Sequence, residues 1–291
     1  MRISMTTGRI SEHVGDLKAI EIIGAAGFDC ADMSLHTITG EAWPWPYQDC
    51  IAHAKEIRKQ CKAVNIAVGQ AHLPFVFRWA ETVSFQQHAI PSLKCMLEAA
   101  SVIESPCVVL HPVHYLPYGV YEKLMTEQTR ILCDELLPVA ERLGIKIALD
   151  NMFAYNNEGL PACDMFGEPE KLKAFLAEYH HPSLVACVDT GHAQLVGTAP
   201  GEMIRCLGTA VQVLHLHDNN GLRDQHMPPY FGVIDWKDTI QALKEIHYTG
   251  DLCFEVLKNY YGRFETQQLL IAAAAFIANL GRIMAAEFKR N

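Results

Sequence analysis

The chain has 291 residues, of which 50% are hydrophobic and 20% are charged, a composition typical of a globular protein with a sizeable core. Its formal net charge is −9, whereas proteins that bind nucleic acid usually present a basic surface. The charge balance therefore argues against a polyanionic partner, and we expect no nucleic acid to bind.

Cysteine usage and the N-terminal residues favour a cytoplasmic location. Ten cysteines are spread from Cys30 to Cys253 without a C-x-x-C pair, which is typical of a reducing compartment rather than of a disulfide framework. The N-terminal stretch MRISMTTGRI has no apolar signal core. The Ala-rich stretch 271–280 is too short to span a bilayer, so we expect a packing helix there and no contact with a membrane.

Short apolar runs rich in β-branched residues alternate with longer amphipathic segments along the whole chain. The predicted strands are residues 2–5, 28–35, 66–73, 107–113, 146–152, 184–189, 211–217 and 251–256. The predicted helices are residues 16–26, 50–64, 85–104, 120–143, 169–179, 201–207, 236–246 and 266–288. Such alternation favours a parallel sheet, and eight strands close a (β/α)8 barrel of about 250 residues. No linker rich in Pro, Gly or Ser divides the chain, so we expect an α/β fold with a single TIM-barrel domain over residues 1–291.

Two segments after predicted strands, 37–48 and 153–166, are longer than the other connections. In a barrel both lie on the face where the loops build the active site. The first contains WPWPY, with Trp43, Trp45 and Tyr47. This aromatic cluster is either a packed surface loop or a lid over a substrate.

Polar residues that bind metals or carry protons stand at the ends of most predicted strands. They are Asp32, His72, His111, Asp150, Asp189, His215, His217 and Glu255, with His192 three residues after Asp189. Side chains along a strand alternate between its two faces. If Leu214 and Leu216 face the helices, the two histidines beside them face the barrel interior. The same alternation places Asp150, Asp189 and Glu255 inside.

Taken together, these residues predict a metal site. Alone, His111 is explained as a hydrogen-bonded core residue and Asp150 as a turn cap. As a group, however, the carboxylates and imidazoles would repel one another or be costly to desolvate without a compensating cation. Imidazole combined with carboxylate suits Mn, Co, Zn or Mg. We therefore predict one divalent metal ion as cofactor.

The order of the motifs AHLPF, LHPV, ALDN, DTGH, HLHDN, RDQH, GVIDW and FEV resembles the xylose isomerase-like barrel superfamily. The resemblance runs from the first predicted strand to the last predicted helix. The superfamily includes sugar and sugar-phosphate isomerases and epimerases, together with metal-dependent apurinic endonucleases.

The resemblance implies site residues by motif. The implied metal ligands are Asp150, Asp189, His215 and Glu255. His217 has the same strand parity as His215, and the H-x-x-D spacing to Asp218 favours His215. The resemblance also implies that His192 binds a substrate hydroxyl or the metal. His72, His111, His217 and Arg223 are further candidate substrate-binding residues, and Arg223 could serve either a phosphate or a hydroxyl.

Two departures from the family pattern concern this site. Asp150 stands where the family usually has Glu, so direct ligation requires a shifted metal or an intervening water. In PPYFGVIDW, Tyr230 and Phe231 stand where the family has Gly and Glu, and we expect this bulky pair to reshape the pocket.

The resemblance implies a divalent-metal-dependent isomerase or epimerase that acts on a sugar or sugar phosphate through an enediolate. Glu255 and Asp150 are the predicted catalytic acid/base groups. Three alternatives stay open: a dehydratase or other lyase with the same metal–enediolate chemistry, a non-catalytic sugar-binding barrel, and an apurinic-type endonuclease. The endonuclease would draw on His72, His111, Asp224 and His226. We expect a small-molecule sugar as partner, and a homo-oligomer is possible.

Overall fold

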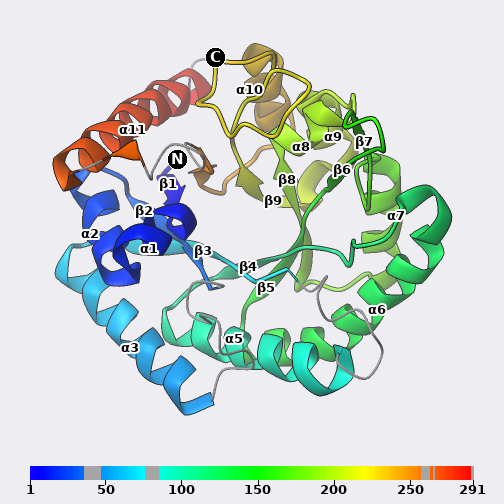
Figure 1. The fold of residues 1–291 in the computed structure, drawn as a ribbon, viewed down its shortest axis with the longest axis horizontal. Coiled ribbons are helices and arrows are strands. Elements are labelled where there is room, and N and C mark those ends of the chain that lie inside the picture. Colours follow the sequence, from blue (N-terminus) through cyan, green and yellow to red (C-terminus); the bar gives the residue numbers. More distant parts are fainter. Residues whose placement is uncertain (36–46, 76–84, 257–262, 265, 290–291) are drawn as a thin grey trace.

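Eight parallel strands form a ring in the computed structural model, which describes residues 1–35, 47–75, 85–256, 263–264 and 266–289 (Figure 1). The strands are β1 (Ile3–Thr6), β2 (Cys30–Ser34), β3 (Ala67–His72), β4 (Cys107–Leu110), β5 (Lys146–Leu149), β8 (Leu184–Asp189), β9 (Val211–His215) and β10 (Leu252–Phe254). Neighbours in this order pair in parallel, and β10 pairs with β1. A parallel bridge between Leu216 and Phe254 joins β9 to β10. The predicted TIM barrel is confirmed.

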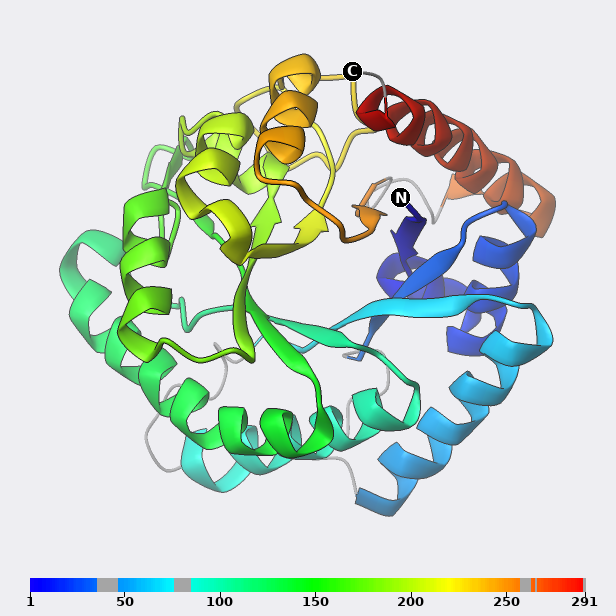
Figure 2. The same cartoon turned by 180° about the vertical axis from the view of Figure 1, so that it is seen from behind.

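Helices surround this ring, as both axial views show (Figure 2). They are α1 (Gly8–Val14), α2 (Asp16–Ala25), α3 (Tyr47–Ala63), the π-helical η3 (Phe85–Ala89), α5 (Ile90–Val102), α6 (Tyr118–Leu143), α7 (Pro169–Tyr179), α8 (Thr190–Leu195), α9 (Pro200–Leu207), the 3-10 turn η4 (Gly208–Ala210), α10 (Trp236–Glu245) and α11 (Gln267–Lys289). The sequence patterns predicted the long helices to within a few residues. The short helices α1 and α8 were not predicted.

The inside of the barrel has an apolar layer beneath the polar one. The layer consists of Cys107, Val109, Ala148, Val185, Cys187 and Val213, all buried. Because side chains two residues apart on a strand face the same way, the residues that follow this layer also point inward. These are His111, Asp150, Asp189 and His215. The polar site therefore lies on an apolar floor at the carboxyl ends of the strands.

Of the two long insertions, only residues 153–166 are described in full. Residues 153–166 contain a small antiparallel hairpin of β6 (Phe153–Tyr155) and β7 (Pro161–Cys163) beside the carboxyl ends of the strands. The lid interpretation of Trp43, Trp45 and Tyr47 concerns side chains outside the described part of the chain.

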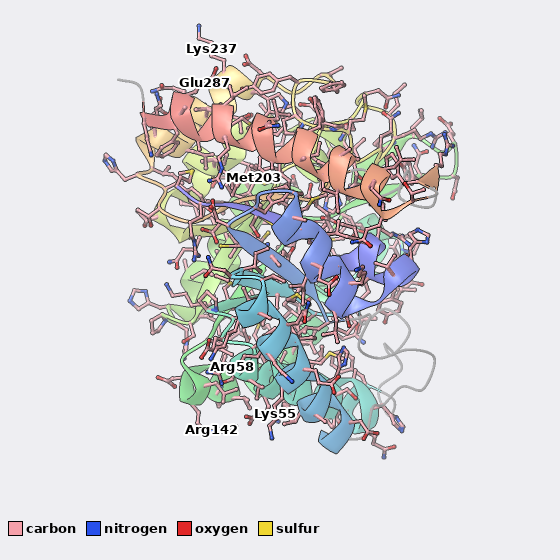
Figure 3. The ribbon with its side chains drawn as sticks, turned by 90° about the vertical axis from the view of Figure 1, so that its left-hand side faces the viewer. Lys55, Arg58, Arg142, Met203, Lys237 and Glu287 are labelled. Atoms are coloured by element: carbon pink, nitrogen blue, oxygen red, sulfur yellow. The ribbon has the colours of Figure 1, made fainter. Side chains whose placement is uncertain are left out.

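Helix α11 covers the outside of β1 and β10. Figure 3 shows α11, α2 and α3 side by side across this face of the barrel. A Cβ at Gly281 would lie 2.7 Å from the Phe254 ring, so the small residue permits the close approach. Among the described helices, α11 alone is long and apolar enough to cross a membrane by length and composition. This corrects the expectation from 271–280 that the apolar segment is too short, because the helix continues on both sides of it.

Candidate metal centre

The four predicted metal ligands converge at the carboxyl ends of β5, β8, β9 and β10. Asp150, Asp189 and His215 are fully buried, and Glu255 keeps 15% of its side chain exposed. His215 Nδ1 lies 3.6 Å from Glu255 Oε2 and 3.9 Å from Asp150 Oδ2. Asp189, His215 and Glu255 each offer one donor atom within 4.8 Å of the others. Residues far apart in the sequence therefore face one small volume.

The second histidine of HLHDN has a different environment from the first. His217 Nε2 lies 2.8 Å and 3.0 Å from the two carboxylate oxygens of Asp189. Its ring occupies the space above Gly191, where a Cβ would lie only 1.9 Å from His217 Cε1. Only a glycine at this position of DTGH therefore leaves room for the His217 ring. This arrangement supports His215 as the ligand, an assignment that stays a prediction.

Asp189 and His192 are linked through the backbone and through Asn151. The Asp189 carboxylate caps α8 by accepting a hydrogen bond from the His192 backbone N–H at 2.7 Å. The Asn151 side-chain amide exchanges two hydrogen bonds with the Asp189 backbone. The Asn151 backbone carbonyl oxygen lies 2.9 Å from His192 Nδ1. Donation from Nδ1 to this carbonyl leaves Nε2 of His192 as an acceptor. The sequence patterns indicated no role for Asn151, although it directly follows Asp150.

His72 and His111 form a neutral pair beside Asp150. Their Nε2 atoms lie 3.1 Å apart, and His111 Nε2 is 3.6 Å from Asp150 Oδ2. Burial lowers the pKa of His72 to about 4 and lowers the pKa of His111 well below its usual range. Phe75 stacks on His111 with ring centroids 3.7 Å apart, so an aromatic side chain borders this part of the site.

A second group of potential ligands lies next to the first. His217, Asp224 and His226 offer donor atoms within 4.8 Å of one another. His226 Nε2 lies 2.8 Å from Asp224 Oδ2. Among the described residues, His217 Nδ1 and Asp224 Oδ1 are buried atoms without a hydrogen-bond partner, and they are 4.0 Å apart.

The charge distribution fits a bound cation. Within the described ranges, the ion-pair partners of Asp32, Asp150 and Asp189 are histidines. Burial alone would raise the pKa of Asp189, but the neighbouring His192 and His217 outweigh it and hold that pKa well below its usual range. Asp150 Oδ2 is buried and has no hydrogen-bond partner in the described part of the chain. A buried carboxylate oxygen without a hydrogen bond, amid imidazoles and other carboxylates, belongs to a donor set that suits a divalent metal.

Asp218 has a structural role that ties two motifs together. Its carboxylate accepts hydrogen bonds from the Trp236 indole N–H at 2.8 Å and from the Asn219 backbone N–H at 2.9 Å. The Asp of HLHDN therefore anchors the Trp of GVIDW. The H-x-x-D spacing reflects this anchor.

Arg223 and the Tyr230–Phe231 pair contact elements around the candidate metal centre. Arg223 donates to the Gly159 carbonyl at 2.8 Å, so the structure places it against the β6–β7 hairpin, and its substrate-binding role stays a prediction. Tyr230 donates to Glu287, and the Phe231 ring contacts Phe276, both on α11. Tyr230 has a positive φ of 71°, and these contacts place both side chains against α11, so the expectation that the pair reshapes the pocket stays a prediction.

Comparison with known proteins agrees with this architecture. The sequence model of the xylose isomerase-like TIM barrel family matches residues 20–280, and the chain belongs to this family. The uncharacterized protein MJ1311 of Methanocaldococcus jannaschii is 30% identical over 186 residues, 62% of this chain and 60% of its own length. The uncharacterized protein y4fM of Sinorhizobium fredii is 25% identical over 60% of this chain and 55% of its own length. The matched region is thus little more than half of these relatives.

Several solved structures share the fold over nearly the whole chain. A D-tagatose 3-epimerase-like protein is 21% identical, with a TM-score of 0.71 over 96% of this chain and 99% of its own. D-psicose 3-epimerase from Clostridium cellulolyticum H10 is 14% identical, with a TM-score of 0.77 over 98% and 99%. The 3-keto-D-glucoside 4-epimerase YcjR from E. coli is 14% identical, with a TM-score of 0.69 over 92% and 94%. At these identities the likeness shows the shared fold.

Proposed function

We propose that the protein is a divalent-metal-dependent isomerase or epimerase of a sugar or sugar phosphate. The observation that carries this proposal is the meeting of Asp150, Asp189, His215 and Glu255 at the carboxyl ends of the strands. Active sites of TIM-barrel enzymes lie at this end. The sugar epimerases that share the fold support the reaction class.

Asp189, His215 and Glu255 would hold the metal ion, with Asp150 as the fourth ligand. When bound, the ion stabilises the negative charge of an enediolate as a Lewis acid. Glu255 takes the proton from the carbon beside the substrate carbonyl, and its partial exposure lets it exchange that proton with water. Asp150, which follows β5 on the other side of His215, is the second acid/base group.

The surrounding residues orient the substrate. His192, whose Nδ1 faces the Asn151 carbonyl, presents Nε2 to a substrate hydroxyl. His72 and His111 are neutral and can donate to or accept from hydroxyl groups. Phe75 and Phe153, which pack on His111 and His192, offer apolar faces to the C–H side of a sugar ring.

Elemental analysis followed by a substrate screen tests this proposal. Purified protein should contain about one equivalent of a divalent ion, and the metal-loaded form should interconvert members of a panel of free and phosphorylated ketoses and aldoses. Chelator-treated protein is the control and should be inactive until the ion returns. Wild-type protein that binds none of Mn, Co, Zn or Mg would contradict the proposal.

An apurinic-type endonuclease is a second candidate, favoured by the group of His217, Asp224 and His226. The net charge of −9 argues against it, because such an enzyme must bind a polyanion. Cleavage of a duplex with one abasic site, absent from an intact duplex, would establish it. Net loss of water from a sugar in the screen would instead identify a dehydratase. The cytoplasmic location, the absence of membrane contact and an oligomeric state remain predictions.

A further inference from the structure

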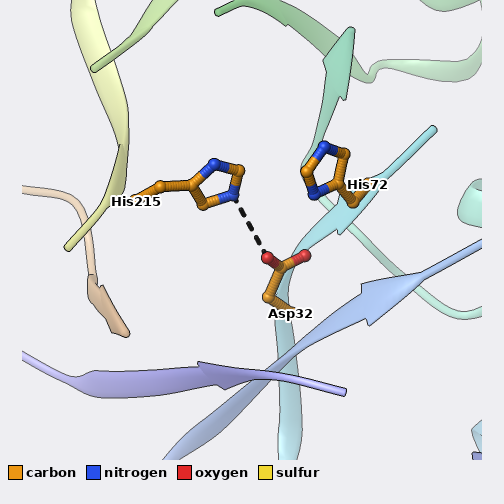
Figure 4. Close-up of side chains that lie close together, drawn as sticks. All are labelled: Asp32, His72 and His215. Carbon is orange, nitrogen blue, oxygen red and sulfur yellow. Dashed lines mark ion pairs between the residues drawn. The ribbon is translucent and has the colours of Figure 1, made fainter. Parts of the chain in front are cut away.

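Asp32 is a fully buried carboxylate on β2 that the proposed proton transfer does not use. Its Oδ2 lies 3.3 Å from His215 Nε2, and Figure 4 shows the carboxylate pointing toward the space between the His215 and His72 rings. Burying a carboxylate is costly unless another group compensates its charge. This cost indicates that Asp32 is buried there because of its interaction with a neighbouring side chain.

The other contacts of Asp32 are neutral. Gln70, on β3, donates to Oδ2 at 3.3 Å. The Cys253 thiol, on β10, lies 3.7 Å from the same oxygen. Both groups contact the oxygen that faces His215, the predicted metal ligand.

The two ring nitrogens of His215 face different groups. Nδ1 points to the candidate metal centre, where Glu255 and Asp150 lie within 4 Å, and Nε2 points to Asp32. An imidazole binds a metal only through a nitrogen that carries no proton, and the partner of the other nitrogen decides which one that is. The His72 ring stacks on His215 with centroids 4.9 Å apart, which restrains rotation of the ring.

We propose that Asp32 is a positioning residue that accepts the Nε2–H of His215 and thereby leaves Nδ1 to bind the metal. The 3.3 Å separation is slightly longer than a usual N–H···O bond, so a small rotation of the ring completes the bond. Carboxylates in this outer position fix the orientation of a ligating histidine and raise its basicity. The inference rests on the proposed function, because it requires a metal at Nδ1.

Metal affinity in matched variants tests the proposal. Asp32→Asn keeps the shape of the side chain and removes its charge, and it should weaken Mn²⁺ or Co²⁺ binding by about 10–100-fold, the usual effect of losing such a partner. Asp16→Asn is the control, because Asp16 is also a buried carboxylate paired with a histidine, His53, at 2.8 Å. The control should bind the metal like wild type. Equal affinity in wild type and Asp32→Asn would overturn the proposal.

Two further readouts separate a positioning role from a merely structural one. In ¹⁵N-histidine spectra of Zn²⁺-loaded wild-type protein, His215 should bind the metal through Nδ1 and carry its proton on Nε2, and a proton on Nδ1 would overturn the proposal. Co²⁺-loaded Asp32→Asn should show an altered visible spectrum at saturating metal, whereas an unchanged spectrum would count against it. Binding of two ions, the second lost in Asp32→Asn, would replace it with direct ligation by Asp32. If wild type binds no metal, the proposed function fails. Equal, measurable affinity in wild type and Asp32→Asn is a different outcome and would refute only the role of Asp32.

Discussion

Gly191 of the DTGH motif has no side chain, and the His217 ring occupies the space that a side chain would fill. A Cβ there would collide with the His217 ring at 1.9 Å, so Gly191→Ala should displace the ring and remove its hydrogen bond to Asp189. We expect metal affinity to fall at least about tenfold, as is typical when a partner of a ligand is lost. Metal titration checks this. Gly119→Ala, where the added Cβ meets nothing within 4 Å, should bind the metal like wild type. Unchanged affinity in Gly191→Ala would mean that His217 does not support Asp189.

Asp150 tests whether a carboxylate one methylene shorter than the family's Glu still reaches the metal. Its Oδ1 accepts the Asn151 backbone N–H, while Oδ2 makes no hydrogen bond to the described residues. If Asp150 binds the metal directly, Asp150→Asn should lower metal affinity about as much as Asp189→Asn does. The matched control Asp164→Asn alters a buried carboxylate that accepts a backbone N–H at 2.7 Å and should leave metal affinity unchanged. Wild-type affinity in Asp150→Asn would remove Asp150 from the ligand set.

His53 makes the stability of the fold depend on pH outside the site. The hydrogen bond to Asp16 raises the pKa of His53 above its ordinary value. Stability from a raised pKa is fully present below the unfolded-state pKa of about 6.5 and is lost as the pH rises through the folded-state pKa. His53→Gln should therefore reduce the free energy of unfolding at about pH 5.5, by at most about 1 kcal/mol, and less at about pH 9. Denaturant unfolding at both values checks this, and an equal loss at both would refute the linkage.

The elements show which features a sequence pattern can predict. Strand β8 and helix α7 were predicted with the bounds that the structure has, because each has a clear apolar pattern and a clear boundary. The β6–β7 hairpin was not, because its side chains are partly exposed and show no alternation. Helix α8 has only six residues and starts directly after β8, too short for a helical period to be recognised.

The convergence of the candidate site residues was predicted to a similar degree, and their roles stay predictions. Strand ends and alternation identified Asp150, Asp189, His215 and Glu255 as neighbours. The different partners of His215 and His217, and the hydrogen bonds of Asn151, depend on contacts between strands far apart in the sequence. No local pattern contains that information.

Helix α11 depends on Gly281 for its close packing on the barrel. A Cβ there would lie 2.7 Å from the Phe254 ring and 3.1 Å from Ile3, both fully buried. Gly281→Val should therefore destabilise the protein by about 1–3 kcal/mol, the usual cost of overpacking a core. Ala286→Val, at an exposed position of the same helix, is the control and should cost well under 1 kcal/mol, roughly its loss of helix propensity. Denaturant unfolding compares them, and similar losses in the two variants would show that α11 is not closely packed at Gly281.

At the scale of the whole molecule, the site exists only when the ring is closed. Strand β10 pairs with β1, and Arg2 forms two hydrogen bonds of 2.8 Å with Asp251 beside this junction. Glu255 directly follows β10, so closure of the barrel brings it to His215. The proposed acid/base group is thus the last site residue along the chain, and the proposed proton transfer requires the complete barrel.

Deuterium incorporation tests this proton transfer most directly. Metal-loaded protein, incubated in deuterated water with the sugar found in the screen, should place deuterium on the carbon beside the carbonyl, because Glu255 is partly exposed and exchanges with solvent. Glu255→Gln cannot take the proton and should slow both exchange and turnover by on the order of a hundredfold or more, while Asp189 and His215 retain measurable metal binding. Exchange at the wild-type rate in Glu255→Gln, or product formed by wild type without any deuterium, would contradict the proposed mechanism.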